Sequence, residues 1–333
     1  PVALTIALAL AGGACSSSGT TTTTPTGSNG TGAGAAFDYG SISATIGGSG
    51  ATFPANFYET VIDAMADTAP ELDNAYGGGG SGKGKTDLQE QLVNYAGTDS
   101  LVKDEDKPKY KGGTILYFPT VAAPITIYYN LAGVDELELS PSALGKIFSG
   151  TITSWNDPVI AADNPGVALP AEPITLAVRS DGSGTTSNFT KYLTAAAGAD
   201  WTLGSGDTVP WTGNVQSGNG STGVSQIISS TPGAIGYVDL SDAIATNLTF
   251  ASVQNKEGEF VQPTLEAASA AVEGAALQSD LTLSALDPDG VEAYPITSVT
   301  YILVYAQQTD AALGAALKGW ISSLLTGAQA LAP

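Results

Sequence analysis

Short apolar runs alternate with amphipathic stretches from Phe37 to the end of the chain. The apolar runs are rich in β-branched and aromatic residues, as strands are; they read TILYFPT, APITIYYN, PITLAV, GAIGYV and VTYILVYA (114–120, 123–130, 173–178, 233–238, 299–306). The amphipathic stretches are typical of helices and occupy residues 55–66, 86–96, 142–149, 187–197 and 312–325. This alternation predicts an α/β fold with mostly parallel sheets.

The length of the chain predicts two lobes rather than one. The 333 residues exceed a typical single α/β domain, and no internal repeat is visible. Two extended stretches that contain proline, YFPTVAAP (117–124) and YPITSV (294–299), are suited to connect the lobes.

The first 37 residues differ in texture from the rest. Residues 2–14 are apolar but too short to span a bilayer, and they resemble the core of a signal peptide. Cys15 follows, and then a Ser/Thr/Gly/Pro tract over 16–37 that cannot bury apolar surface. This order resembles a bacterial lipoprotein start with Cys15 lipidated, although Gly12 stands where that signal prefers Leu. A secretory signal with a chance cysteine is the alternative; both place the folded part outside the cytoplasm.

Composition excludes several classes of function. The chain has 32 acidic residues against 11 basic ones, a net charge of −21, which argues against nucleic acid or an anionic membrane surface as a partner. It has no histidine and one cysteine, so Ser-His and Cys-His catalysis and the common zinc sites are excluded. Catalysis by carboxylates alone is not excluded by composition, but the expectation is that the protein is not an enzyme and holds no metal or cofactor. The acidic composition is explained either by a need for solubility or by adaptation to a saline environment.

Three Gly/Ser/Thr turns stand immediately before predicted helices. They are GGSGATFP (47–54), GGGGSGKGK (77–85) and DGSGTT (181–186), and the third follows Arg179, the only arginine in the chain. A helix N-terminus presents unpaired N–H groups and the positive end of a dipole, and glycine lets an anion come close. Each turn alone also fits an ordinary helix cap. Together with the arginine they predict an anion site.

The second turn also matches a nucleotide-binding pattern. GGSGKGKT (79–86) fits G-x-x-x-x-G-K-[ST], with a helix expected from about Thr86. A P-loop follows a buried apolar strand, however, and the preceding residues are ELDNAY. We therefore interpret the match as a Gly/Ser/Lys-rich loop rather than an NTPase site.

These segments together resemble the periplasmic phosphate-binding protein of bacterial phosphate ABC transporters. The resemblance covers nearly all of residues 44–330 and rests on GSGATFP, YGGGGSGKG, YAGTDSLV and above all VRSDGSGTTSNFTKYL (178–193). It implies a two-lobed, type II periplasmic-binding-protein-like fold with a hinge and a ligand cleft between the lobes. By this resemblance, residues 38–120 plus 295–333 form lobe one and 121–294 form lobe two.

The resemblance also implies a function, partners and a ligand set. The expected function is capture of inorganic phosphate by a monomer and its delivery to membrane ABC permease subunits. The expected phosphate ligands are Thr52, Phe53, Ser81, Asp99, Arg179, Ser183, Gly184 and Thr185. Gly82 and Lys83 depart from the family, which has smaller or hydroxyl residues there.

Two residue types in this set explain the chemistry. Arg179 offers paired planar donors for two phosphate oxygens, and Asp181 is expected to fix its orientation, or else only to form a turn with Gly182. The Asp99 carboxylate can only accept hydrogen bonds, so its ligand must carry a proton. Phosphate carries one near neutral pH and sulfate does not. The alternative for Asp99 is a helix cap or surface position. The competing functions are a secreted phosphatase or phosphoesterase and a receptor for another oxyanion such as sulfate.

Overall fold

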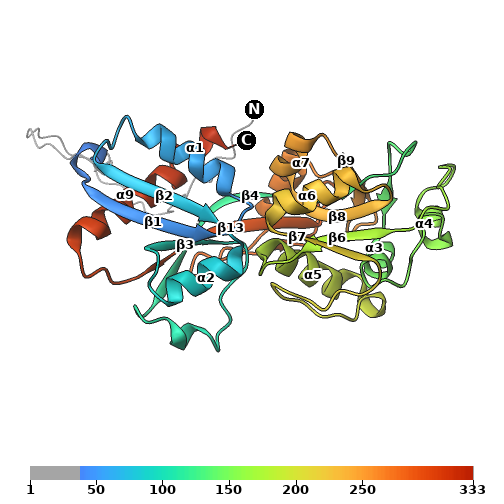
Figure 1. The fold of residues 1–333 in the computed structure, drawn as a ribbon, viewed down its shortest axis with the longest axis horizontal. Coiled ribbons are helices and arrows are strands. Elements are labelled where there is room, and N and C mark those ends of the chain that lie inside the picture. The colour runs from blue at the N-terminus through green and yellow to red at the C-terminus, as the bar shows by residue number, and fades with distance from the viewer. Residues whose placement is uncertain (1–37, 333) are drawn as a thin grey trace, which may run out of the picture.

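The computed structural model describes residues 38–332, which form two α/β lobes side by side (Figure 1). The signal-like segment, Cys15 and the 16–37 tract lie outside the described residues. The strands are β1 Ala44–Gly50, β2 Leu72–Gly78, β3 Tyr95–Thr98, β4 Ile115–Tyr129, β5 Glu138–Leu139, β6 Thr175–Arg179, β7 Val215–Gly218, β8 Ala234–Asp239, β9 Thr249–Phe250, β10 Ser252–Gln254, β11 Phe260–Val261, β12 Ala285–Leu286 and β13 Ile296–Tyr305. The helices are α1 Ala55–Met65, α2 Ser81–Gln89, α3 Pro141–Phe148, α4 Pro158–Asp163, α5 Gly184–Ala196, α6 Gly220–Ser230, α7 Leu240–Thr246, α8 Leu265–Glu273 and α9 Ala311–Leu325.

One hydrogen-bonded path of strands runs through both lobes. Its order is β2-β1-β3-β13-β4-β8-β6-β7, and β12 and β9 pair beside it with β13 and β4. The outer strands of each lobe are parallel, as predicted: β1 with β2 and β3, and β6 with β7 and β8. The prediction of mostly parallel sheets is wrong at the centre. There β13 and β4 pair antiparallel with each other and with β3 and β8, because these strands cross between the lobes without a helical crossover.

The crossing strands contain the two predicted connecting stretches. Residues 117–124 lie within β4, and 294–299 include the start of β13, where Thr297 pairs with Pro124. The register shifts between Thr300 and Tyr301, opposite Val121 and Pro119. A bulge of this kind bends a strand and locally disrupts its ladder. The two lobes are therefore joined by a pair of irregular strands, which is the arrangement a hinge needs.

Helices cover both faces of the sheet in each lobe. In the first lobe, α1 packs on β2 and α9 on β1 through a core that contains Tyr58, Val61 and Trp320, and α2 packs on the opposite face through Leu88. In the second lobe, α3 and α5 form the larger core and α6 covers the other face through Val224 and Ile228. Each fully buried aliphatic or aromatic side chain contributes about 1.5–3 kcal/mol of transfer free energy to this packing.

Residues 265–294 pack against both lobes. Ala267 and Tyr294 belong to the large core of the second lobe, whereas Ala271 and Ala285 share a core with Leu88 of the first. The division of the chain at residues 120 and 294 thus stays a prediction.

The second turn differs from expectation. Helix α2 begins at Ser81, not near Thr86, and ends at Gln89, and residues 95–96 belong to β3. Glycine and serine have low helix propensity, so the sequence did not predict the first turn of this helix. Packing requires it: a Cβ on Gly84 would lie 2.6 Å from Gly50 Cα and from Ser49 O. Among the described residues, no helix is long and apolar enough to cross a membrane.

Candidate functional site

The predicted ligands follow directly on the carboxyl ends of parallel strands. Thr52 and Phe53 come after β1, Ser81 after β2 and Asp99 after β3, while Arg179 ends β6. These strand ends of the two lobes point toward each other (Figure 1). In open α/β sheets ligands bind outside the carboxyl ends of the strands. The fold therefore carries the candidate residues to one region between the lobes.

Asp99 is a buried carboxylate at the centre of this region. Asp99 is 4% exposed, and its carboxylate oxygens accept hydrogen bonds from Thr300 Oγ1 at 2.6 Å and from Ser81 Oγ at 3.3 Å. Ser81 Oγ in turn accepts from the Asp99 N–H at 3.1 Å. Burial raises the pKa of Asp99 to about 7, while the bond from Thr300 and the charge of Arg179 act in the opposite direction. Asp99 is thus neither a surface residue nor a helix cap.

Arg179 is held by the predicted partner. Its Nε donates to Asp181 Oδ1 at 2.8 Å and its Nη2 donates to Asp181 Oδ2, which fixes the plane of the guanidinium. Asp181 Oδ1 also accepts from the Gly220 N–H at 3.0 Å. Burial raises the pKa of Asp181, but the bonds and charge of Arg179 outweigh it and the pKa is lowered. The expected pairing is confirmed.

The start of α5 faces Asp99 and Ser81 across the lobes. Ser183 caps the helix, its Oγ accepting from the Thr186 N–H at 3.1 Å, and the N–H groups of Gly184 and Thr185 precede the first intrahelical bonds. A Cβ on Gly184 would lie 2.5 Å from Ser81 Oγ and 2.7 Å from Asp99 Cβ. Thr185 Oγ1 is buried and has no hydrogen-bond partner among residues 38–332. The first residue of α5 therefore lies against Asp99 and Ser81 of the other lobe, and the next residue carries an unsatisfied hydroxyl.

Thr52 and Phe53 close the same region from the first lobe. Thr52 Oγ1 accepts from the Ser221 N–H at 3.3 Å and lies 3.1 Å from Ser221 Oγ, at the start of α6. Phe53 is buried in the core of the second lobe with residues such as Ile125. The structure thus brings residues from both lobes into contact, and all eight predicted ligands lie at this junction.

The turn before α6 was not singled out from the sequence. Residues 217–223, SGNGSTG, span the end of β7, Asn219 and the first turn of α6, and Gly220 has a φ of +66°. This is a fourth Gly/Ser turn before a helix, the same signal that marked the other three. Thr300 and Asn188 were also missed; Asn188 Nδ2 donates to Asp99 O at 2.7 Å and to Ser298 Oγ at 2.8 Å.

The two departures in the second loop have structural roles. Gly82 donates its N–H to Gly182 O of the other lobe at 2.8 Å, and a Cβ there would lie 3.1 Å from Gly182 Cα. Lys83 pairs with Asp87 on the next turn of α2. Gly82 therefore permits a backbone contact between the lobes.

The nucleotide-binding pattern takes on a different role. A strand, β2, does precede the loop, but it pairs only with β1 and is partly exposed along its length. Lys85, the lysine of the pattern, is engaged with Asp207 at 2.6 Å. Within residues 38–332 no group of three or more acidic or cysteine side chains is arranged to hold a metal ion.

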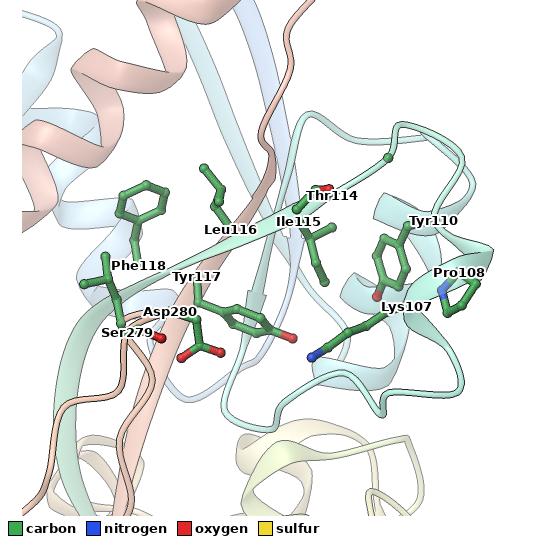
Figure 2. A pocket seen from close by; sticks show the side chains of 12 residues that line it. Lys107, Pro108, Tyr110, Thr114, Ile115, Leu116, Tyr117, Phe118, Ser279 and Asp280 are labelled. Atoms are coloured by element: carbon green, nitrogen blue, oxygen red, sulfur yellow. The ribbon is translucent and has the colours of Figure 1, made fainter.

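A surface pocket of about 600 Å³ lies elsewhere (Figure 2). Its walls come from Lys107 and Tyr110 on one side, β4 from Ile115 to Phe118, and Asp280 on the other side. It contains none of the predicted ligands, which lie where the lobes touch and are buried except for the partly exposed Thr52.

Comparison with known proteins places the chain in a family. Residues 18–326 match the PBP superfamily domain. The phosphate-binding protein PstS 3 of Mycobacterium leprae is 35% identical over 297 residues, covering 86% of this chain and 80% of that protein. PstS of Methanocaldococcus jannaschii is 35% identical over 306 residues, covering 84% and 78%.

Two solved structures share the fold. The phosphate-bound periplasmic phosphate-binding protein PfluDING superposes with a TM-score of 0.69 at 23% identity, covering 83% of this chain and 84% of that one. A putative phosphate ABC transporter substrate-binding protein from Clostridium perfringens gives 0.62 at 17% identity, covering 85% and 93%. At these identities the likeness concerns the two-lobed fold. With the sequence matches, it follows that this chain belongs to the PBP superfamily and, within it, to the PstS family of phosphate-binding proteins.

Proposed function

We propose that this protein captures inorganic phosphate between its two lobes outside the cytoplasm and delivers it to a membrane ABC permease. The observation that carries the proposal is Asp99, a buried acceptor set beside the guanidinium of Arg179 and the start of α5. Such a site suits an anion that brings its own proton. The names of the 35%-identical relatives, phosphate-binding protein PstS, support the same ligand.

The proposed ligands each supply one part of the recognition. Arg179, oriented by Asp181, gives two charged N–H donors to one edge of the phosphate. The other oxygens are surrounded by hydroxyls and backbone N–H groups of Thr52, Phe53, Ser81, Ser183, Gly184 and Thr185. Asp99 accepts a hydrogen bond from the protonated phosphate oxygen. Dipoles and a single cation hold the anion, so an acidic exterior is compatible with the function.

The remaining parts of the proposal concern the chain as a whole. Residues 38–120 and 295–333 form one lobe and 121–294 the other, and the protein acts as a monomer that binds without turnover. Cys15, outside the described residues, carries a lipid, and the 16–37 tract tethers the lobes to the membrane surface.

The deciding experiment is calorimetric titration of the desalted protein with phosphate and, separately, with sulfate, repeated with Asp99→Asn. We expect tight one-to-one phosphate binding and no sulfate heat, because sulfate would leave two acceptors facing each other; a missing hydrogen bond of this kind costs roughly 10⁴-fold in affinity. Asp99→Asn is expected to reduce the difference between the affinities for phosphate and for sulfate. Equal binding of both anions by the unmodified protein would refute the role of Asp99, and binding of neither would refute the phosphate site.

A further inference from the structure

Three polar side chains connect the lobes beside the proposed phosphate site. Lys85 on α2 donates to Ser100 Oγ at 2.8 Å and pairs with Asp207 Oδ2 at 2.6 Å. Ser100 Oγ also donates to Asp207 Oδ1 at 2.8 Å. Lys85 and Ser100 belong to the first lobe, and Asp207 lies in the loop between α5 and β7 of the second. This cluster forms only while the lobes touch.

Both ends of the cluster are anchored next to proposed ligands. Ser100 is the residue after Asp99, and the backbone carbonyl of Asp207 accepts the Ser183 N–H at 2.9 Å. Ser183 caps α5, whose first residues face Asp99. A movement that separates Lys85 from Asp207 therefore also withdraws the start of α5 from Asp99.

The cluster is better placed to stabilise closure than an ordinary surface ion pair. The side chains of Lys85 and Asp207 are 16% and 24% exposed, whereas those of Lys109 and Asp106, which pair within the first lobe, are 60% and 36% exposed. Exposed pairs contribute little because water screens them, but hydrogen bonds between charged groups in a shielded place are stronger. A contact present in the closed form alone shifts the open–closed equilibrium by its full free energy.

We propose that Lys85, Ser100 and Asp207 form a closure latch that sets how long phosphate stays bound. The latch is not a ligand; it holds the lobes together around the ligand and positions Ser183. This inference rests on the proposed function, since it names residues that regulate the same site. A latch of this kind acts on the dissociation rate, because association occurs before the contact exists.

The second lobe contains a matched control. Lys146 donates to Ser142 Oγ at 3.1 Å, Ser142 Oγ donates to Asp200 Oδ2 at 2.6 Å, and Lys146 Nζ lies 3.5 Å from Asp200 Oδ2. The residue types are the same and the side chains of Lys146 and Asp200 are 28% and 33% exposed. All three residues lie within the second lobe, so this cluster is indifferent to closure.

The test compares Asp207→Asn with Asp200→Asn in stopped-flow measurements of phosphate release. We expect Asp207→Asn to speed dissociation roughly tenfold with little change in association, and Asp200→Asn to leave both rates within about twofold. Lys85→Met and the double variant complete a cycle in which the two changes should not add. Thermal unfolding of each variant shows that it is folded.

A second readout separates the latch from the proposed ligand. In a Cys15→Ser background, dyes on Leu92→Cys and Ile244→Cys, which are 73% and 70% exposed on different lobes, report closure without phosphate. Asp207→Asn should increase the open fraction and Asp200→Asn should not. If phosphate fails to bind but this difference appears, the proposed function fails, while the role of the three residues in holding the lobes together is supported. If neither release nor dye distance distinguishes the two variants, the latch is refuted.

Discussion

At the scale of single residues, Asp99, the proposed acceptor for protonated phosphate, carries a cost to stability. Burial raises its pKa to about 7, and the nearby charge of Asp239 adds to the increase, while Thr300, Arg179 and Ser81 favour the ionised form. A carboxyl whose pKa is 3.8 in the unfolded chain thus retains its proton in the folded state up to neutral pH. The ionised carboxylate that the proposed site requires is therefore the form that folding disfavours.

This conflict predicts how stability depends on pH. Between pH 4 and 7 the folded protein binds a proton at Asp99 that the unfolded chain does not, so the contribution of Asp99 is full at low pH and is lost as pH rises, by about 1.4 kcal/mol per unit. Asn cannot ionise. We expect Asp99→Asn, free of phosphate, to have a higher free energy of unfolding than the unmodified protein at pH 8.

Urea unfolding of both proteins at pH 5, 6, 7 and 8 checks this expectation. The difference between them should grow from pH 5 to pH 7 and then level off. Comparing the two proteins cancels other titrating groups, among them Asp242, whose pKa burial also raises to about 7. A difference that is the same at every pH would show that Asp99 is ionised throughout.

At the scale of elements, the helix starts determine whether the lobes can meet. Gly184 is the first residue of α5, and Ser81 is the first residue of α2. The two come so close that a methyl group on Gly184 would overlap Ser81 Oγ and Asp99 Cβ of the other lobe. The absence of a side chain at this position is therefore required for closure rather than for folding of α5.

Replacing Gly184 by Ala should weaken phosphate binding without unfolding the protein. Within the helix alanine is favourable by up to about 1 kcal/mol, so the thermal midpoint without phosphate should stay equal or rise, while phosphate affinity falls at least tenfold. Gly314→Ala in α9 is the control, because the nearest atom to its Cβ is Gln308 Cβ at 3.5 Å. Calorimetry and thermal unfolding of both variants decide; unchanged affinity in Gly184→Ala would argue against close approach of the lobes in the bound state.

Some helices could be predicted from the sequence, but one helix boundary and the central strand pairing could not. Hydrophobic periodicity located α1, α3, α5 and α9, because each buries one apolar stripe. It misplaced α2, whose first turn is built from Ser, Gly and Lys and is justified only by packing against Gly50. The antiparallel pairing of β4 with β13 joins residues about 180 positions apart, which local patterns do not report.

Some residues of the candidate site could likewise be predicted from the sequence and others could not. Residues that lie in local motifs, such as Arg179 with Asp181, could be found from their neighbours in sequence. Ser221, Thr300 and Asp207 reach the junction only through the tertiary fold, and the pairing of Lys85 with Asp207 depends on contact between lobes. Nothing in the sequence around either residue indicates that partner.

At the scale of the whole molecule, charge is distributed unevenly. Six of the ten lysines lie between residues 83 and 111, where six acidic residues balance them, so the rest of the chain carries the entire net charge of −21. This balanced segment includes α2, which flanks the junction of the lobes (Figure 1). An approaching phosphate is repelled by most of the surface but meets a nearly neutral region beside the proposed site.

These long-range and local charges predict that salt changes the association rate of phosphate more than its dissociation rate. Repulsion by the net charge is screened beyond about 10 Å at 0.1 M salt, so phosphate association should accelerate a few-fold between 20 and 500 mM NaCl, the reverse of a steered encounter. Dissociation should respond less, since Lys85 and Asp207 are largely shielded from solvent. Stopped-flow rates at several salt concentrations test both. Slower association in high salt would instead mean that the lysines of residues 83–111 attract phosphate more strongly than the remaining surface repels it.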